Sequence, residues 1–292
     1  MTERRRLVKV PATSANLGPG YDVLAAALSL HLELEVTETG QFSVDAGGTG
    51  APETRENLCV RAFEMLHPAD GLRFEMRSEI PIAAGLGSSA AAIIAGLMAA
   101  EHLYELAIDH DELLDKAVEL EGHPDNVAAA LFGGFVACSM EDGVPRATRF
   151  DPPEGVEGVL VIPGDRVTTD DARGALPPEI PLGDVVANIA AATELVLGIE
   201  RADLTLIGRG LRDRVHQPRR AHIYPRSMEI VAEAGRLGAI GATISGAGPS
   251  VLVWTFWQST GKVVDAIKQR VGGWAEVRRA PFSPLGADVP EL

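Results

Sequence analysis

A glycine- and serine-rich loop that leads directly into an apolar helix constrains the fold of this chain most. Residues 80–100 contain no charged side chain, so the segment is about long enough to be considered as a membrane span. Pro81 and two glycines interrupt its first half, however, and the uninterrupted apolar pattern begins only near Ser89 and ends at Glu101. This pattern predicts a buried helix that starts from a loop. The loop and first helical turn comprise Pro81, Ile82, Ala83, Ala84, Gly85, Leu86, Gly87, Ser88, Ser89, Ala90 and Ala91.

Such a loop is suited to bind an anion. Glycines allow close approach of the backbone, and the first turn of a helix presents unpaired N–H groups and a positive dipole end. The hydroxyls of Ser88 and Ser89 can contact a phosphate or its magnesium. The chain lacks GxxxxGK[ST], which excludes an ordinary P-loop. The loop does match GxGxxA, but Pro81 and the charged stretch 77–79 break the strand that a dinucleotide-binding fold needs, and 103–110 makes a poor second strand.

Hydrophobic periodicity predicts two α+β domains. In the first half we expect strands at 7–10, 32–37, 72–77 and 133–140, and helices from about 89 and over 111–121. The polar, proline-bearing stretch 141–155 predicts a boundary between domains 1–150 and 151–292. In the second half we expect strands at 158–162, 240–244, 251–256 and 274–279, with helices at 170–176, 184–200, 202–215, 227–237 and 261–271. This order is that of a ferredoxin-like split βαβ layer.

Charge and cysteine usage narrow the functional classes. Lys plus Arg number 26 and Asp plus Glu 41, giving a formal net charge of −15. An acidic chain repels phosphate backbones, and its one dense basic run, 4–6, is a short terminal segment, so we expect no nucleic-acid partner. Cys59 and Cys138 have neither metal nor redox spacing and predict buried thiols in a reducing compartment. Because Pro11 and polar residues follow 7–10 at once, we expect no secretory signal and no membrane partner, and a cytoplasmic location.

Two more glycine-bearing segments complete a pattern that spans nearly the whole chain. They are Pro11–Asp22, a turn-rich loop after a strand, and Ile244–Ser250, which connects two strands. Together with the loop at 81–91, they resemble the GHMP small-molecule kinases, the family that groups galactokinase, homoserine kinase, mevalonate kinase and phosphomevalonate kinase. The resemblance implies an α+β, two-domain GHMP-kinase fold with an N-terminal ribosomal protein S5 domain 2-like domain and a C-terminal ferredoxin-like domain. It also implies ATP and Mg²⁺ as cofactors, with 81–91 as the phosphate-binding loop.

Two motifs are most similar to the homoserine-specific branch of the family: Val10–Asp22 (VPATSANLGPGYD) and Glu121–Asn126 (EGHPDN). They imply phosphorylation of the side-chain hydroxyl of L-homoserine to O-phospho-L-homoserine, a step in threonine synthesis. Tyr21 stands where phenylalanine is more usual and Ala25 where glycine is more usual, and neither departure changes a polar role. The resemblance also implies a homodimer, although nothing in the sequence identifies an interface.

The resemblance assigns residues to ATP and metal. Ser89 and Glu121 occupy the positions of the metal-binding serine and glutamate of the family. Glu119 remains an alternative to Glu121 as the metal ligand. Only one of the two can face the site, because residues two apart on a helix do not share a face. Asn57 occupies a position on the adenine side of the nucleotide.

The substrate's charges guide the remaining assignments. A carboxylate favours arginine, whose planar fork can donate two parallel hydrogen bonds. Arg173 in TTDDAR and Arg220 in HQPRR resemble the family's pair of basic substrate residues. Asp22 suits the ammonium group. The resemblance places further substrate contacts on Asn16, His123 and Asn126.

The catalytic base is left open. Asp125 and Asn126 stand at the reacting position, and Asp125 matches an acid that is implicated in removing the hydroxyl proton in related kinases. Homoserine kinases have been interpreted as working without a dedicated base, and a loose transition state needs little deprotonation before attack. We therefore hypothesise that Asp125 mainly orders Asn126 and its loop.

Three alternatives remain at this point. A related kinase could act on another small alcohol, although a neutral substrate has no carboxylate for the two arginines. A family member that has lost catalysis could serve as a ligand-binding regulator. The intact polar and glycine positions of the motifs argue against this alternative. A nucleic-acid-binding role for an S5-like domain would need a basic face, which a net charge of −15 disfavours.

Overall fold

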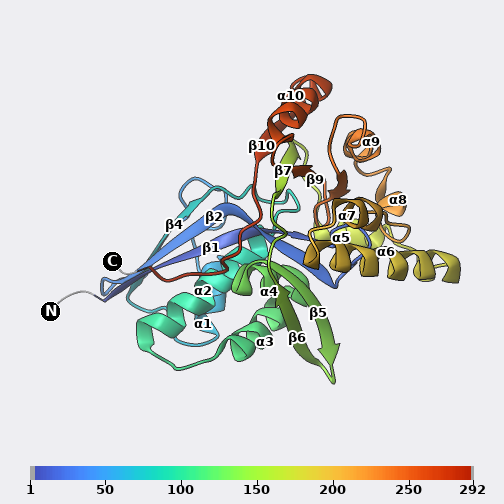
Figure 1. Cartoon of the computed structure of the whole chain (residues 1–292). Coiled ribbons are helices and arrows are strands. Elements are labelled where there is room, and N and C mark those ends of the chain that lie inside the picture. Colours follow the sequence, from blue (N-terminus) through green and yellow to red (C-terminus); the bar gives the residue numbers. More distant parts are fainter. Residues whose placement is uncertain (1–3, 291–292) are drawn as a thin grey trace.

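The computed structural model describes residues 4–290 and contains two β-sheets with helices packed against them (Figure 1). The first sheet has the order β3-β4-β2-β5-β6, and β1 also pairs with β2. Long antiparallel pairing of β1 with β2 sets Arg5 opposite Thr37 and Ala15 opposite Ala25. The six strands are β1 (Arg5–Ala15), β2 (Leu24–Glu38), β3 (Ser43–Asp45), β4 (Leu72–Ser78), β5 (Phe135–Glu141) and β6 (Val144–Phe150).

Four helices accompany this sheet: α1 (Leu58–Glu64), α2 (Ser88–Tyr104), α3 (His110–Glu121) and α4 (Pro124–Phe132). The central helix α2 packs against β1, β2 and the other three helices, and every residue from Ala90 to Ala100 is buried. Small side chains allow this close packing, since a Cβ at Gly96 would lie 2.1 Å from the Cys59 carbonyl oxygen. The prediction of a buried helix that starts from the glycine loop is confirmed.

The second sheet comprises β7 (Val156–Pro163), β8 (Gly241–Ile244), β9 (Val251–Phe256) and β10 (Ala275–Arg279). Its order is β10-β7-β9-β8, and every pair is antiparallel. Helices α9 (Pro225–Glu233) and α10 (Thr260–Val271) pack on it, so the ferredoxin-like layer is confirmed. Between β7 and β8 the chain also forms α5 (Thr169–Gly174), α6 (Leu182–Glu200), α7 (Leu204–Gly210) and α8 (Gln217–Arg220).

The stretch 141–155 contains a strand that the sequence pattern did not indicate, and the predicted helix 202–215 is shorter in the structure. The stretch 141–155 contains the edge strand β6, and only the part after Phe150 links the two sheets. An edge strand tolerates polar side chains and proline, which explains why this stretch resembled a linker. The predicted helix 202–215 ends as α7 at Gly210, because the Asp213 carboxylate accepts hydrogen bonds from the backbone N–H groups that follow it.

The C-terminal segment returns to the first sheet. Beyond β10 the chain runs along the first sheet, where Phe282 pairs with Leu28 of β2 and Asp288 with Lys9 of β1 (Figure 1). Phe282 also contacts Trp254 of β9, with ring centroids 4.9 Å apart, so the residues after β10 pack on both sheets. The division into 1–150 and 151–292 stays a prediction.

Helix α6 is unusually apolar for its position. Among the helices of residues 4–290 it is the one that is long and apolar enough to cross a membrane. Its inner side packs on α7, and Asn188 Nδ2 donates to the Pro19 carbonyl and to Asp213 Oδ1. A single helix of this kind is weak support for a membrane span, since helices of soluble proteins meet the same criteria.

Candidate active site

A cavity of about 600 Å³ brings the three glycine-bearing segments together. Its wall contains most of the predicted site residues: Asn16, Asp22, Asn57, Ile82, Ala83, Gly85, Leu86, Gly87, Ser88, Ser89, Glu121, His123, Asp125, Asn126, Arg173 and Arg220. Four predicted residues lie outside this wall. Pro81 and Ala84 line a smaller neighbouring cavity, and Ala90 and Ala91 are fully buried in the core.

The loop before α2 leaves its backbone open to an anion. Gly87 precedes α2 with φ 68°, and no side chain caps the first turn. The first N–H groups of this long helix therefore remain available to a ligand. The segments around the loop hold it in place, because Ser245 Oγ donates to the Gly85 carbonyl (2.6 Å) and the Thr13 N–H donates to the Leu86 carbonyl (3.1 Å).

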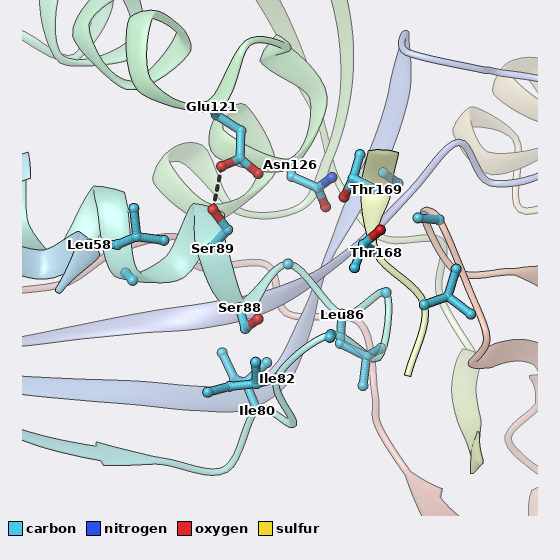
Figure 2. A pocket seen from close by; sticks show the side chains of 18 of the residues that line it. Leu58, Ile80, Ile82, Leu86, Ser88, Ser89, Glu121, Asn126, Thr168 and Thr169 are labelled. Atoms are coloured by element: carbon cyan, nitrogen blue, oxygen red, sulfur yellow. Dashed lines mark hydrogen bonds between the residues drawn. The ribbon is translucent and has the colours of Figure 1, made fainter. Parts of the chain in front are cut away.

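Ser89 and Glu121 meet beside this loop. Ser89 Oγ donates to Glu121 Oε2 at 2.5 Å (Figure 2). Burial raises the pKa of Glu121, and the hydrogen bond from Ser89 opposes this rise. Glu119 is exposed on α3. The two oxygens are of the hard type that Mg²⁺ prefers, so this pair fits the metal that the family implies.

Few further protein ligands are at hand for a metal ion. Within residues 4–290, no group of three or more His, Cys, Asp and Glu side chains could hold one. A magnesium site of two protein oxygens suits an ion that is otherwise held by phosphates and water.

Asp22 and Arg173 contact each other. Arg173 Nη1 and Nη2 donate to the two Asp22 carboxylate oxygens at 2.9 and 2.8 Å. Burial opposes the charge on Arg173, but its contacts with Asp22 outweigh burial and raise its pKa. The two residues predicted for the substrate's opposite charges thus neutralise each other across the cavity, with Asp22 between β1 and β2 and Arg173 on α5.

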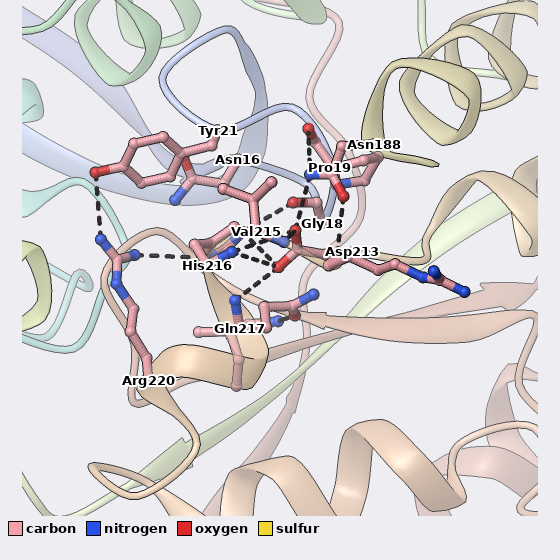
Figure 3. Close-up of polar contacts among 12 residues, drawn as sticks. Asn16, Gly18, Pro19, Tyr21, Asn188, Asp213, Val215, His216, Gln217 and Arg220 are labelled. Atoms are coloured by element: carbon pink, nitrogen blue, oxygen red, sulfur yellow. Dashed lines mark hydrogen bonds and ion pairs between the residues drawn. The ribbon is translucent and has the colours of Figure 1, made fainter. Parts of the chain in front are cut away.

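Arg220 is a buried cation without a carboxylate partner. Its side chain lines the cavity although the residue is 1% exposed. Its guanidinium donates from Nε to the Ala172 carbonyl (2.7 Å), from Nη1 to His216 Nδ1 (3.4 Å) and from Nη2 to the Tyr21 hydroxyl (3.3 Å; Figure 3). Guanidinium carries five N–H donors, so two remain free of these contacts. Throughout residues 4–290 it forms no ion pair, and a buried charge of this kind favours an anionic ligand.

A buried network beneath Arg220 fixes its position. His216 is 0% exposed, and its Nε2 donates to the Gly18 carbonyl at 2.8 Å (Figure 3). Burial lowers the pKa of His216; Asp213 opposes this effect and Arg220 adds to it. These contacts favour the neutral tautomer of His216 with its proton on Nε2, because the bare Nδ1 can then accept from Arg220. Gln217 Oε1 accepts from the Ile244 N–H and attaches α8 to β8.

Asn126 lies between two ordering contacts. Thr13 Oγ1 donates to Asn126 Oδ1 at 2.6 Å. Asp125 is 1% exposed, and its Oδ1 accepts from the Asn126 N–H and from His123 Nδ1, each at 2.7 Å. Burial opposes the charge of His123, but the hydrogen bond to Asp125 and the charge of that carboxylate outweigh burial and raise the pKa of His123. The geometry is that of a carboxylate that orders its neighbours.

Asn57 already has protein partners. Its side chain caps α1 by accepting from the Cys59 N–H at 2.9 Å, and its Nδ2 donates to the Pro52 carbonyl at 2.8 Å. Apolar side chains surround this part of the cavity, among them Leu58, Ile80 and Ile82 (Figure 2). A flat, apolar group such as a nucleobase fits this end of the cavity better than a charged one.

Sequence reasoning missed Thr13, Asp213 and His216. Thr13 is an ordinary residue of a turn-rich motif, and only the fold brings it to Asn126, 113 positions away. The HQPRR motif directed attention to Arg220 alone, although His216 begins the same motif. No spacing rule would have indicated that His216 contacts Gly18 or that Asp213 accepts a hydrogen bond from Asn188.

Comparison with known proteins identifies the family of this chain. The family profiles for the GHMP kinases N terminal domain and the GHMP kinases C terminal match residues 57–134 and 195–272. A homoserine kinase of Streptomyces avermitilis is 40% identical over 298 residues, covering 98% of this chain and 95% of the relative. One of Thermus thermophilus is 40% identical over 247 residues, covering 83% and 84%. The crystal structure of a homoserine kinase from Cytophaga hutchinsonii superposes with a TM-score of 0.88 at 29% identity, covering 99% of this chain and 98% of the other. The chain therefore belongs to the GHMP kinase family, and within it to the homoserine kinases.

Proposed function

We propose that this protein transfers the γ-phosphoryl group of ATP to the side-chain hydroxyl of L-homoserine, giving O-phospho-L-homoserine and ADP. The observation that carries this proposal is the buried Arg220, a cation without a carboxylate partner among the described residues, in the same cavity as the uncapped loop before α2. One end of the cavity thus suits polyphosphate and the other a carboxylate.

ATP is held along the loop. Backbone N–H groups at the start of α2 contact its phosphates, and the apolar end near Leu58 and Ile82 receives the base. Ser89 and Glu121 would hold Mg²⁺, which would neutralise charge on the phosphates. The exposed Glu119 is the weaker candidate for this role.

Homoserine is bound as a zwitterion. Its carboxylate accepts from Arg220 and Arg173, and its ammonium group donates to Asp22. Asp22 and Arg173 form an ion pair at 2.8 Å. The two charges of the substrate exchange with this pair, so that neither side chain loses a partner on binding. A neutral alcohol offers no such exchange, and for that reason we expect it to bind weakly.

The reacting hydroxyl is positioned by Asn126, with Asn16 and His123 beside it. Thr13 holds the Asn126 amide by its hydrogen bond at 2.6 Å. The hydroxyl oxygen attacks the γ-phosphorus and the bond to ADP breaks. The hydroxyl proton passes late in the loose transition state to an oxygen of the transferred phosphoryl group. Because the Asp125 carboxylate already accepts from His123 and Asn126, we assign it to ordering these groups.

The direct test is ADP release from Mg-ATP with L-homoserine added and omitted, and with L-serine, L-threonine, mevalonate and galactose at equal concentration. We expect turnover with homoserine alone. Turnover confined to another alcohol would refute the substrate, and tight ATP binding without any turnover would favour a regulator.

Arg220→Lys keeps a charge but loses the planar fork, so the KM for homoserine should rise at least about tenfold with the KM for ATP unchanged.

The proposal also covers the cellular compartment and the oligomeric state of the enzyme. Cys59 and Cys138 are buried free thiols, which fits the reducing, cytoplasmic compartment that we propose. The homodimer that the resemblance implies remains a prediction, and sedimentation equilibrium would test it.

A further inference from the structure

The hydroxyl of Tyr21 lies where two guanidinium groups meet. Arg173 Nη1 donates to it at 3.1 Å and Arg220 Nη2 at 3.3 Å. The same ring lies 5.7 Å from the Arg173 Cζ and 5.1 Å from the Arg220 Cζ, measured to its centroid. Arg173 belongs to α5 and Arg220 to α8, whereas Tyr21 belongs to the loop between β1 and β2. One side chain therefore joins both cations and also lines the cavity. The tyrosine thus does change the polar contacts at this position, contrary to the expectation from the sequence.

These contacts determine what the hydroxyl can still do. A phenol has one donor proton and can accept through two lone pairs, and arginine N–H groups can only donate. Both accepting positions of the Tyr21 oxygen are thus engaged. Within the part of the chain from 4 to 290, no hydrogen bond takes up its proton. Accepting from cations polarises an O–H group and strengthens it as a donor, so this proton suits an anionic acceptor.

We propose that Tyr21 binds the substrate carboxylate together with Arg220. Its O–H donates to one carboxylate oxygen, and its oxygen keeps the Arg220 and Arg173 guanidinium groups side by side. The ring also contacts His216, with centroids 5.4 Å apart, so Tyr21 rests on the same support that fixes Arg220 (Figure 3). This assignment rests on the proposed function, because it takes L-homoserine as the ligand.

Tyr21→Phe removes the hydroxyl and keeps the ring. We expect the KM for L-homoserine to rise at least about tenfold, with kcat and the KM for ATP within about twofold of wild type. Two inhibitors separate carboxylate binding from general damage. L-2-Aminobutyrate lacks the hydroxyl of homoserine but keeps the carboxylate, and its inhibition constant should rise by the same factor. 3-Amino-1-propanol lacks the carboxylate, and its inhibition constant should stay unchanged.

Tyr224→Phe is the matched control. Tyr224 is a buried tyrosine whose hydroxyl has no hydrogen-bond partner within residues 4–290 and which does not line the cavity, so its loss should leave all constants as in wild type. An unchanged KM for homoserine in Tyr21→Phe, or an equal rise in the inhibition constants of both inhibitors, would overturn this inference and leave the proposed function standing. Wild-type enzyme that fails to phosphorylate L-homoserine would instead overturn the proposed function, and the carboxylate ligand with it.

Discussion

Replacing Gly87 by alanine should damage the fold and the site together, by amounts that the geometry predicts. Gly87 has φ 68°, a left-handed conformation that costs an ordinary residue about 1–2 kcal/mol. An added Cβ would lie 1.9 Å from Thr13 Oγ1, so Thr13 must move and release Asn126. Loss of that hydrogen bond costs about 1 kcal/mol more. The total of about 2–3 kcal/mol corresponds to a fall in Tm of about 5 °C for a chain of this size.

The effect on catalysis should exceed the effect on stability. Displacement of Asn126 and of the phosphate loop by even a fraction of an ångström misaligns the reacting groups, and we expect kcat to fall about a hundredfold. Thermal unfolding and the ADP-release assay measure the two effects on the same preparation.

Gly40→Ala isolates the backbone term. Gly40 also has a positive φ, 80°, but a Cβ there would meet nothing within 4 Å, and the residue lies outside the cavity. It should lower Tm by less than Gly87→Ala and leave kcat unchanged. Thr13→Val removes only the hydroxyl and should reproduce part of the loss in kcat. Wild-type kcat in Gly87→Ala, or equal losses of kcat in the two glycine variants, would refute this reasoning.

Three further predictions concern single groups. Asp125→Asn should keep measurable turnover, whereas a loss of about four decades or more with unchanged homoserine binding, measured by single-turnover kinetics and calorimetry, would identify a base. Glu121→Gln should lower kcat/KM for Mg-ATP about a hundredfold or more, and it should raise Tm because it removes a buried carboxylate. Glu119→Gln should change neither quantity. The opposite pattern would assign the metal to Glu119. Burial raises the pKa of the Cys59 and Cys138 thiols to about 12, so neither should react with a thiol reagent until the protein unfolds, and rapid labelling of the native protein would contradict their burial.

Regular periodicity made much of the fold predictable. The alternation in Leu72–Ser78 reflects one buried and one exposed face, and β9 has the predicted bounds Val251–Phe256. The order of elements in the second half was sufficient for the ferredoxin-like layer. In these segments, local pattern and tertiary burial agree.

Other elements depend on tertiary packing rather than on local pattern. The first part of β2, around Ala25–Ala27, has weak strand propensity but is buried between neighbouring elements. The short helices α1 and α4 carry little periodic signal; caps and packing define them, as the Asn57 cap of α1 illustrates. The edge strand β6 resembles a loop because one side of it faces solvent.

The candidate site was predictable in its residues but not in their partners. Motifs named Asp22 and Arg173, yet their mutual ion pair joins positions 151 residues apart, which no local rule relates. The free donors of Arg220 likewise became evident only when Ala172, His216 and Tyr21 were found around it. Sequence patterns indicate chemical capacity, whereas the accounting of donors and acceptors requires the fold.

Identification of the product tests the central claim most directly. Purified protein is incubated with Mg-ATP and L-homoserine, and the phosphorylated product is examined by ³¹P NMR with coupling to protons. The account predicts a phosphate monoester coupled to the methylene protons that bore the side-chain hydroxyl, formed in equal amount to ADP. A phosphoryl group on the carboxylate or the amine, or ADP formed with inorganic phosphate alone, would contradict it.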